Sequence, residues 1–216
     1  MQKIALIVAG GIGARMNTSI PKQFLLLKGT PILMLTLKQF SHFEKIVLVL
    51  PNTQFDYWLT LCETYNFTLK HTLVAGSENR FQSVKNGLEK VNHKSIVAIH
   101  DGVRPLVSKS LINRLIAQTK EGFGAIPIIP VKDSIRRVNG KGSTHIGKNK
   151  LYNVQTPQCF FSSNIKKAYT QEFSERFTDD ASVFESYAGK ITTILGEEKN
   201  LKITTQEDLR ISELIQ

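Results

Sequence analysis

The stretch "KIALIV", residues 3–8, runs directly into "AGGIGARMNTSIPKQF", residues 9–24, and this junction decides the fold. A short apolar run that ends in glycines is typical of a strand that opens into a loop in an α/β protein. Glycines permit positive φ and let backbone N–H groups approach a ligand without a Cβ in the way. We therefore expect this loop to hold an anion, most naturally a triphosphate.

Two familiar phosphate-binding patterns do not fit the loop. The dinucleotide fingerprint G-x-G-x-x-G requires a third glycine where the chain has Met16, and the P-loop requires a Gly-Lys-Ser/Thr tripeptide that follows none of these glycines. What remains is a set of backbone donors with two cations, Arg15 and Lys22, that can close over the same anion. A glycine-rich turn with two solvated cations is the alternative interpretation.

Length and composition predict one soluble domain spanning residues 1–216. Hydrophobic residues make up 41% of the chain and charged residues 21%, and the apolar runs are too short to cross a bilayer. No secretory signal is visible, so we expect a cytoplasmic protein. Cys62 and Cys159 lie far apart and outside any C-x-x-C pair, which disfavours a disulfide framework or a zinc site.

The charge balance favours an anionic partner. The formal net charge is +10, but only 8% of residues are aromatic and no run of five or six like charges occurs. Nucleic-acid-binding surfaces usually cluster their cations along one face, whereas these cations fall beside glycines and strand ends. Small phosphorylated substrates fit this distribution better than nucleic acid or a membrane.

Apolar runs alternate with stretches of helical periodicity, which predicts an α/β three-layer sandwich with a mostly parallel sheet. The expected strands are 3–8, 45–50, 69–74, 95–100, 124–129 and 191–195. The expected helices are 31–40, 53–65, 80–90, 110–120, 179–187 and 205–215. In such a sheet, ligands bind at the carboxyl ends of the strands.

One segment departs from this alternation. Residues 131–150 contain six cations and one anion around the turn sequence "NGKG", which predicts a projecting β-hairpin. Its apolar positions, Ile135, Val138 and Ile146, favour a hairpin that covers a partner surface. A mobile basic loop is the alternative.

Candidate catalytic and binding residues lie at the ends of the predicted strands. Asp101 and Gly102 follow the strand at 95–100, where a carboxylate can meet a Mg²⁺ ion that escorts phosphates, and Arg104 can fork onto a phosphate oxygen. The alternative interpretation of these residues is a local Asp–Arg pair that caps a turn. Lys202 lies between two apolar residues in a strand-like run, which places an ammonium where a packed side chain is expected.

A second group lies on the loop after residues 69–74. Gly76 ends that strand, and Arg80 and Ser83 open the next helix, whose N-terminal N–H groups can take an anion or a base edge. Simple capping by Ser77 or Asn79 is the alternative. Cations, glycines and one strand-end aspartate, with no recognisable nucleophile–base couple, favour phosphoryl or nucleotidyl transfer.

Six motifs in order carry a resemblance over nearly the whole chain, from Ile4 to about Leu214. They are "AGGIGARM…PKQF", "AGSENRFQSVKNGL", "AIHDGVRPLV", "NVQTPQCF", "FTDDASVFE" and "EEKNLKITTQEDL". Together they closely resemble the 2-C-methyl-D-erythritol 4-phosphate cytidylyltransferase family of the non-mevalonate isoprenoid pathway. The resemblance implies a nucleotidyltransferase fold, a homodimer, CTP as co-substrate and Mg²⁺ as the metal. It also implies that the hairpin, residues 131–155, is a dimerisation arm.

The resemblance further implies roles for individual residues. Arg15, Lys22 and Lys202 would stabilise the pentacoordinate α-phosphate, and Asp101 would also meet the metal. The residues expected to contact CTP are Ala9, Gly10, Gly11, Gly13, Gly76, Ser83, Asp101 and Gly102. Those expected on the acceptor side are Arg104, Ser134, Lys148 and Thr178.

The chain departs from the family pattern at two acceptor-side positions. Lys148 stands where an arginine is usual and cannot make a bidentate phosphate contact, and Ser134 replaces a threonine. A pentitol-phosphate cytidylyltransferase, such as one acting on ribitol 5-phosphate, shares several of the motifs, although "TDDASVFE" favours the methylerythritol enzyme. A non-catalytic nucleotide- or RNA-binding domain is the rival of another class.

Overall fold

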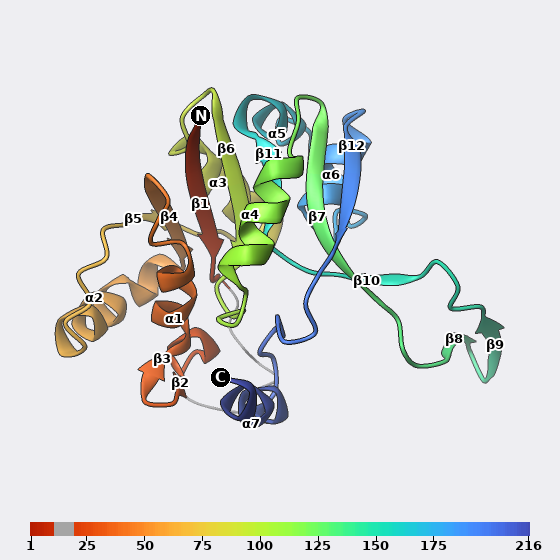
Figure 1. The fold of residues 1–216 in the computed structure, drawn as a ribbon, viewed down its shortest axis with the longest axis horizontal. Coiled ribbons are helices and arrows are strands. Elements are labelled where there is room, and N and C mark those ends of the chain that lie inside the picture. Colours follow the sequence, from red (N-terminus) through yellow and green to blue (C-terminus); the bar gives the residue numbers. More distant parts are fainter. Residues whose placement is uncertain (11–19) are drawn as a thin grey trace.

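A central, mostly parallel sheet organises the computed structural model, which describes residues 1–10 and 20–216 (Figure 1). Its strands are β1 (Gln2–Val8), β4 (Lys45–Leu50), β5 (Thr72–Ala75), β6 (Ser95–Asp101), β7 (Phe123–Pro130), β10 (Tyr152–Val154), β11 (Gln158–Phe161) and β12 (Lys190–Leu195). Their order is β10-β7-β11-β6-β1-β4-β5, with β12 pairing in parallel with β7. β10 and β11 run antiparallel to their neighbours.

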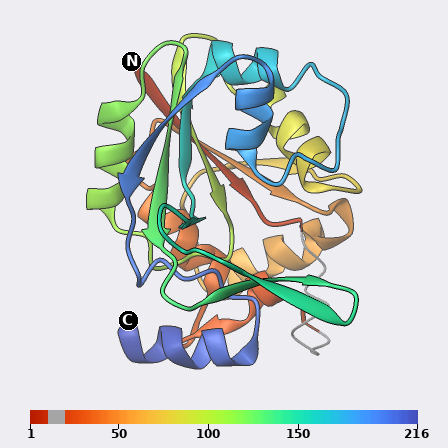
Figure 2. The same ribbon diagram turned by 90° about the vertical axis from the view of Figure 1, so that its right-hand side faces the viewer.

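Helices cover both faces of this sheet, so the predicted three-layer α/β sandwich is confirmed (Figure 2). They are α1 (Ile32–Gln39), α2 (Phe55–Thr64), α3 (Arg80–Glu89), α4 (Lys109–Gln118), α5 (Ser162–Ala168), α6 (Asp180–Ser186) and α7 (Gln206–Ile215). All six expected strands and all six expected helices form, within a few residues of the expected bounds. β10, β11 and α5 were not expected; β10 and β11, with three and four residues, are too short to give a clear periodic signal.

The alternation of side chains along β1 assigns each face of the sheet its own core. Ala5 and Ile7 pack with residues of α1, α2 and α4, whereas Ile4, Leu6 and Val8 pack with residues of α3, α5 and α6. Because both faces are covered, the strand reads as a continuous apolar run and not as an alternating one.

A smaller cluster lies beyond the carboxyl ends of the strands. Leu27, Ile32, Val103 and Ile203 pack together, and Leu209 of α7 rests against them. Leu27 belongs to the short ribbon of β2 (Leu26–Leu27) and β3 (Thr30–Pro31). Figure 1 shows α7 and this ribbon below the sheet. Thr205 caps α7 in a capping box with Asp208.

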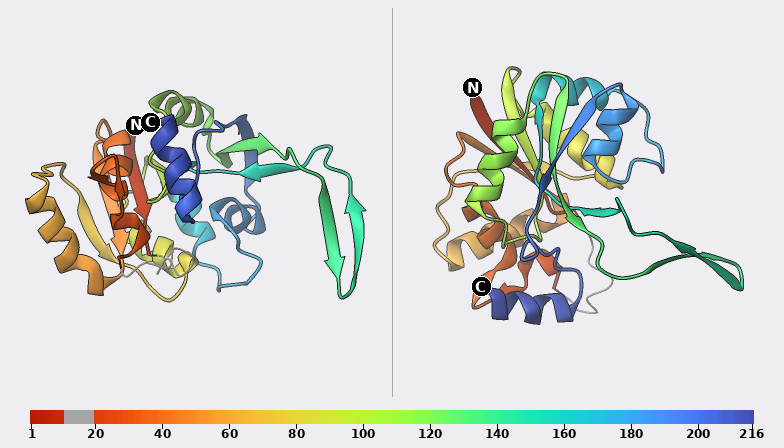
Figure 3. Two further views of the ribbon diagram at one scale, coloured as in Figure 1. Left: turned by 90° about the horizontal axis from the view of Figure 1, so that it is seen from below. Right: turned by 45° about the vertical axis from the view of Figure 1, so that its right-hand side comes forward.

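The predicted hairpin forms and projects from the body of the molecule (Figure 3). β8 (Ile135–Asn139) pairs antiparallel with β9 (Gly142–Ile146), and Gly140 has a φ of +58° in the turn. The side chain of Val138 is exposed. Residues 152–154 are not part of the projection, because they pair with β7 as β10.

Other features agree with the expectations from composition. Among the helices of the described residues, none has both the length and the apolar character needed to cross a bilayer. Cys62 and Cys159 are both free thiols, and Cys159 is buried in the core.

Gly87 brings α3 close to the sheet, which leads to a prediction about stability. A Cβ at this position would lie 2.8 Å from Cγ2 of Val49 and closer still to the side chain of Leu6. We expect Gly87→Ala to lower the free energy of unfolding by about 1–3 kcal/mol through overpacking, although alanine is the better helix former. Urea denaturation measures this, with Glu89→Ala on the exposed end of α3 as the control. A stabilised Gly87→Ala variant would contradict the close contact.

Candidate functional site

A cleft of about 870 Å³ opens at the carboxyl ends of the parallel strands. Six residues with a predicted role in the site line it: Ala9, Gly10, Lys22, Ser83, Asp101 and Lys202. They come from the ends of β1 and β6, from the short 3-10 helix η2 (Lys22–Phe24), from the first turn of α3 and from the loop after β12. The sheet therefore gathers residues that lie up to nearly two hundred positions apart.

The pairing of β1 with β6 places the floor of the cleft. Val8 is opposite Asp101 in the parallel register, and the N–H of Gly102 donates to the carbonyl of Val8 at 2.8 Å. A Cβ at Gly102 would stand 2.7 Å from Cβ of Ala9. Glycine is therefore needed at position 102 for the ends of the two strands to meet.

Three cations surround the buried carboxylate of Asp101. Its Oδ2 lies 3.0 Å from Nε of Arg104 and 3.2 Å from Nζ of Lys202, and its Oδ1 lies 3.9 Å from Nε of Arg80. Burial alone would raise the pKa of Asp101, but the charges of Lys202, Arg80 and Arg104 outweigh it and hold the pKa well below its ordinary value. Asp101 is therefore ionised at every physiological pH.

Arg80 links this cluster to a second buried carboxylate. Its Nη1 and Nη2 bind the two oxygens of Asp180 at 2.8 and 2.7 Å, and the hydroxyl of Tyr169 donates to Asp180 at 2.6 Å. Asp180 begins α6, so this fork fixes the first turn of α6 against the first turn of α3. Burial disfavours the charge of Arg80, but the pair with Asp180 raises its pKa above the ordinary value.

A neutral histidine supports Asp101 from the core. Nε2 of His100 lies 3.1 Å from the carbonyl of Arg104, and Nδ1 lies 2.9 Å from Oγ1 of Thr156. Since a carbonyl only accepts, Nε2 carries the proton and Nδ1 accepts from the hydroxyl of Thr156. The same hydroxyl oxygen accepts from the N–H of Asp101 at 3.1 Å. Burial lowers the pKa of His100 to about 4.

The loop after β5 is held by Ser83. Its hydroxyl accepts from the N–H of Ser77 at 3.0 Å and donates to the carbonyl of Asn79 at 2.8 Å. Asn79 caps α3 by accepting from the N–H of Gln82, so the capping alternative is correct for this residue. A Cβ at Gly76 would lie 3.3 Å from the Ser83 hydroxyl, so a side chain there would require this hydroxyl to shift slightly.

The other predicted site residues within the described ranges do not line the cleft. Gly76, Gly102 and Arg104 lie directly behind its walls, and Arg104 spends two donors internally, on Asp101 and on the carbonyl of Asn200 at 2.8 Å. Three residues, Ser134, Lys148 and Thr178, lie in the arm and in the segment before α6. Gly11, Gly13 and Arg15 lie outside the described residues.

The expectation that Lys202 lies in a strand is wrong. Residues 201–204 form neither strand nor helix, and the segment joins the rest of the molecule through the N–H of Ile203, which donates to the carbonyl of Val103 at 2.9 Å. The apolar neighbours of Lys202 give a strand-like pattern because Ile203 packs into the cluster beneath the cleft.

The site offers limited ligation for a metal ion. No group of three or more His, Cys, Asp or Glu side chains that could hold an ion occurs within residues 1–10 and 20–216. Asp101 does line the cleft, and its Oδ1 has only the 3.9 Å approach of Arg80 among the ion pairs of the described chain. One such oxygen suits Mg²⁺, which usually takes one or two carboxylates and completes its shell with phosphate oxygens and water.

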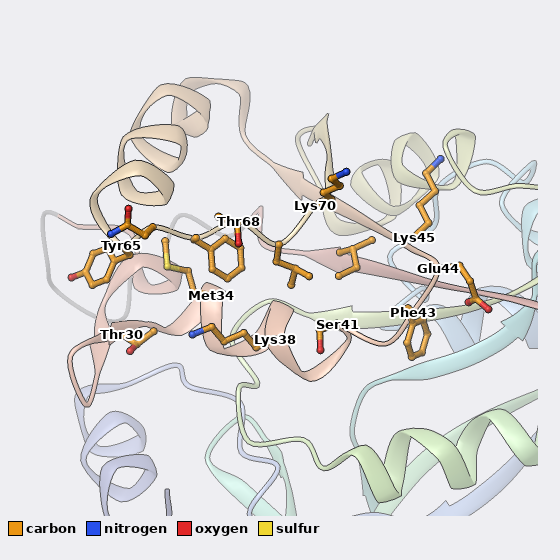
Figure 4. Close-up of a pocket in the computed structure, with 14 residues that line it drawn as sticks. Thr30, Met34, Lys38, Ser41, Phe43, Glu44, Lys45, Tyr65, Thr68 and Lys70 are labelled. Atoms are coloured by element: carbon orange, nitrogen blue, oxygen red, sulfur yellow. The ribbon is translucent and has the colours of Figure 1, made fainter.

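A second hollow, of about 640 Å³, lies between α1, the start of β4 and the segment before β5 (Figure 4). Met34, Phe43 and Phe67 line it together with Lys38 and Lys70. It opens at the amino ends of β4 and β5. Because ligands of parallel sheets bind at the carboxyl ends, the cleft at Asp101 is the stronger candidate.

Sequence reasoning did not assign a role to several residues that build the site. The Arg80–Asp180 fork joins positions one hundred residues apart, and no local spacing signals such a pair. Thr156 lies within the motif "NVQTPQCF" and Asp180 within "FTDDASVFE". The sequence marks both motifs but gives no physical reason for a threonine or an aspartate at these two positions. Thr53, Gln54 and Glu78 also line the cleft.

Comparisons with known proteins agree with the geometry. The family model for 2-C-methyl-D-erythritol 4-phosphate cytidylyltransferase matches residues 3–216. The protein of that name from Bacteroides fragilis is 46% identical over 215 residues, which cover 98% of each chain. The one from Bacillus licheniformis is 37% identical over 216 residues, which cover 97% of this chain and 94% of the other. The crystal structure of the protein of that name from Thermus thermophilus superimposes with a TM-score of 0.82 at 27% identity, covering 100% of this chain and 98% of the other.

His100 gives the protein a pH-dependent stability. Because burial lowers its folded pKa to about 4 from 6.5, the unfolded chain takes up a proton more readily. The contribution of the neutral imidazole is fully present above pH 6.5 and is lost as the pH falls toward 4. We expect wild type to lose about 2 kcal/mol of unfolding free energy between pH 7 and pH 5 beyond the loss seen in His100→Gln. Urea denaturation at both pH values measures this, and equal losses in the two proteins would contradict it.

Proposed function

Because the chain belongs to the 2-C-methyl-D-erythritol 4-phosphate cytidylyltransferase family, we propose how its cleft carries out the reaction of that family. The chain is a nucleotidyltransferase that transfers a cytidylyl group from CTP to 2-C-methyl-D-erythritol 4-phosphate in isoprenoid precursor biosynthesis. The observation that supports the placement of this chemistry is the convergence of Gly10, Lys22 and Lys202 around Asp101 in one cleft.

The transfer proceeds by direct displacement. An oxygen of the acceptor phosphate forms a bond to the α-phosphorus of CTP, the bond from that phosphorus to the bridging oxygen breaks, and pyrophosphate leaves with the electron pair. The acceptor phosphate is already ionised, so the step requires no general base. In agreement, no histidine occurs among the described residues that line the cleft.

Lys22 and Lys202 stabilise the charge that develops during this displacement. The backbone N–H of Gly10 would begin the cradle for the triphosphate, since the N–H of Ala9 beside it is donated to the carbonyl of Val49 at 2.9 Å. Gly11, Gly13 and Arg15, which lie outside the described residues, would complete that cradle, with Arg15 as a third cation. The ammonium of Lys202 is kept at the cleft by its pair with Asp101 at 3.2 Å. Preorganised cations of this kind cost no reorganisation when the transition state forms.

Asp101 would hold a Mg²⁺ ion through its Oδ1, with phosphate oxygens and water as the other ligands. When bound, the ion supplies positive charge that neutralises the phosphates. Asp101 also orients Lys202, because its Oδ2 accepts from that ammonium. The cytosine and ribose would lie against Ser83 in the first turn of α3, which lines the cleft, while Gly76 and Gly102 support its walls from behind, directly after β5 and β6.

The acceptor side of the site is built by two copies of the chain. Ser134 and Lys148 lie on or next to the projecting arm, and no residue of the arm lines the cleft of its own chain among the residues described. The arm also exposes apolar side chains, including Val138 at 71% exposure. A homodimer in which each arm reaches the other cleft would cover these side chains and bring Ser134 and Lys148 to Arg104 and Thr178.

The two free thiols suit a cytoplasmic enzyme, because disulfides are rare in reducing compartments. This location follows from the proposed role, since CTP is an intracellular substrate.

Substitution of Lys22 tests the assignment of the cleft. We expect Lys22→Ala to lower kcat by about 100-fold or more, while KM for CTP changes less, because the ammonium acts mainly on charge that develops in the transition state. Pyrophosphate release with CTP, Mg²⁺ and the acceptor measures both constants. Lys38→Ala, in the second hollow, serves as the control and should turn over normally. Near-normal kcat in Lys22→Ala would rule out the assignment.

Complementation tests the shared site. A mixture of Lys22→Ala, which is defective in the cleft, and Lys148→Ala, which is defective in the arm, should form mixed dimers with one intact site. We expect each variant alone to be nearly inactive and the refolded mixture to recover up to about a quarter of wild-type activity, since random pairing makes half the dimers mixed. Activity in the mixture no higher than the average of the two variants would contradict an arm that crosses between subunits.

A further inference from the structure

Two buried amides, one from each of two motifs, remain without a role after the cleft is assigned, and they meet directly behind it. Gln155, from "NVQTPQCF", and Asn200, from "EEKNLKITTQEDL", are both buried. Neither lines the cleft. Buried amides that contact each other but not the ligand need a reason of their own, because each carries four hydrogen-bonding positions to satisfy.

The side-chain amide of Gln155 forms its hydrogen bonds with the loop that leads to Lys202. Its Nε2 donates to the carbonyl of Glu197 at 2.8 Å and to that of Asn200 at 3.4 Å. Its Oε1 accepts from the N–H of Glu197 at 3.2 Å and from Nδ2 of Asn200 at 3.4 Å. A Cβ at Gly196 would collide with this oxygen, so the loop passes close against the amide.

Asn200 joins the same loop to two residues that support Asp101. The Nδ2 of Asn200 donates to the backbone carbonyl of Thr156 at 2.8 Å. The backbone carbonyl of Asn200 accepts from Nη1 of Arg104, also at 2.8 Å. Both partners of Nδ2 are acceptors, so the orientation of the amide is fixed. Through Arg104 and Thr156, the loop is joined to the two residues that also bind Asp101.

Apart from an exposed ion pair between Glu198 and Lys132, the other anchors of the loop lie toward its two ends. Residues 196–204 form no strand or helix, so no regular ladder of backbone hydrogen bonds holds them. Glu197 lies five positions before Lys202, and its carboxylate accepts from the hydroxyl of Ser108. After Lys202, the N–H of Ile203 donates to the carbonyl of Val103. The amides of Gln155 and Asn200 therefore hold the part of the loop that directly precedes Lys202.

We propose that Gln155 and Asn200 are positioning residues for the transfer reaction, which hold the loop so that the ammonium of Lys202 stands at Asp101 in the cleft. This inference rests on the proposed role of Lys202. A lysine has a flexible four-carbon stem, so the position of its charge depends on where its backbone is anchored. A misplacement of about 1 Å at a reacting centre is enough to lower a rate by about 100-fold.

A purely structural role for these amides is the rival explanation, and a double-mutant cycle separates the two. We expect Gln155→Ala to lower kcat by about 10-fold or more in the wild-type background, with a smaller change in KM for CTP. In the Lys202→Met background, Gln155→Ala should lower kcat by less than about twofold, because the group through which it acts is already gone. Pyrophosphate release by the full-length protein measures each corner of the cycle.

Two further variants keep the test informative. Asn200→Ser repeats the cycle with a smaller change, in case Gln155→Ala does not fold. Ser162→Ala removes a buried hydroxyl that accepts from the N–H of Ser95 at 3.1 Å, at the other end of β11 and away from the cleft. It should lower the melting temperature while kcat stays normal, which separates a loss of stability from a loss of positioning.

The outcomes are distinct. Equal losses of kcat from Gln155→Ala in both backgrounds would overturn the positioning role while leaving the role of Lys202 intact. A Lys202→Met variant with normal kcat would overturn the proposed role of Lys202 and, with it, this inference. A loss in the wild-type background that disappears without Lys202 supports both.

Discussion

The buried carboxylate of Asp101, paired with three cations, is the interaction on which the rest of the site depends. Lys202, Arg80 and Arg104 come from three segments that only the folded sheet brings together. An unpaired charge at this depth would be prohibitively costly, and a cation cluster without the carboxylate would repel itself. Asp101 is therefore stable as a buried charge only when these cations are in place, which couples the geometry of the site to the completeness of the fold.

Hydrogen bonds extend this constraint into the surrounding core. Arg80 also donates to Asp180, which accepts from the hydroxyl of Tyr169 as well. Arg104 also donates to the backbone carbonyl of Asn200. Beneath Asp101, the hydroxyl of Thr156 joins its backbone to the neutral ring of His100. In such a network most buried polar groups are satisfied, so removing one member leaves its neighbours unpaired. The floor of the cleft around Asp101 is consequently held by a continuous hydrogen-bond network, which suits a reaction that depends on fixed charge.

Much of the fold was predictable from the sequence, because β1, β4 and β6 are long apolar runs and the helices carry clear periodicity. The cleft was predictable in outline for a similar reason: glycines and Asp101 directly follow strands, and parallel strands end at one edge. The Arg80–Asp180 fork was not, since nothing in the local sequence joins positions one hundred residues apart. β11 was missed because four residues give no period, and Lys202 was misplaced in a strand because a packed loop and a strand share the same alternation.

The distance along the chain between the two walls of the cleft bears on how the enzyme is made. One wall is formed by Ala9 and Gly10 and the other by Lys202, so residues nearly two hundred positions apart meet in one place. Contacts of this span close slowly, because the loop entropy must be overcome before they form. A nascent chain still short of residue 202 on the ribosome can build strands and helices, but it lacks the lysine to which we assign a role in the transfer. On that proposed role, synthesis must pass residue 202 before cytidylyl transfer begins.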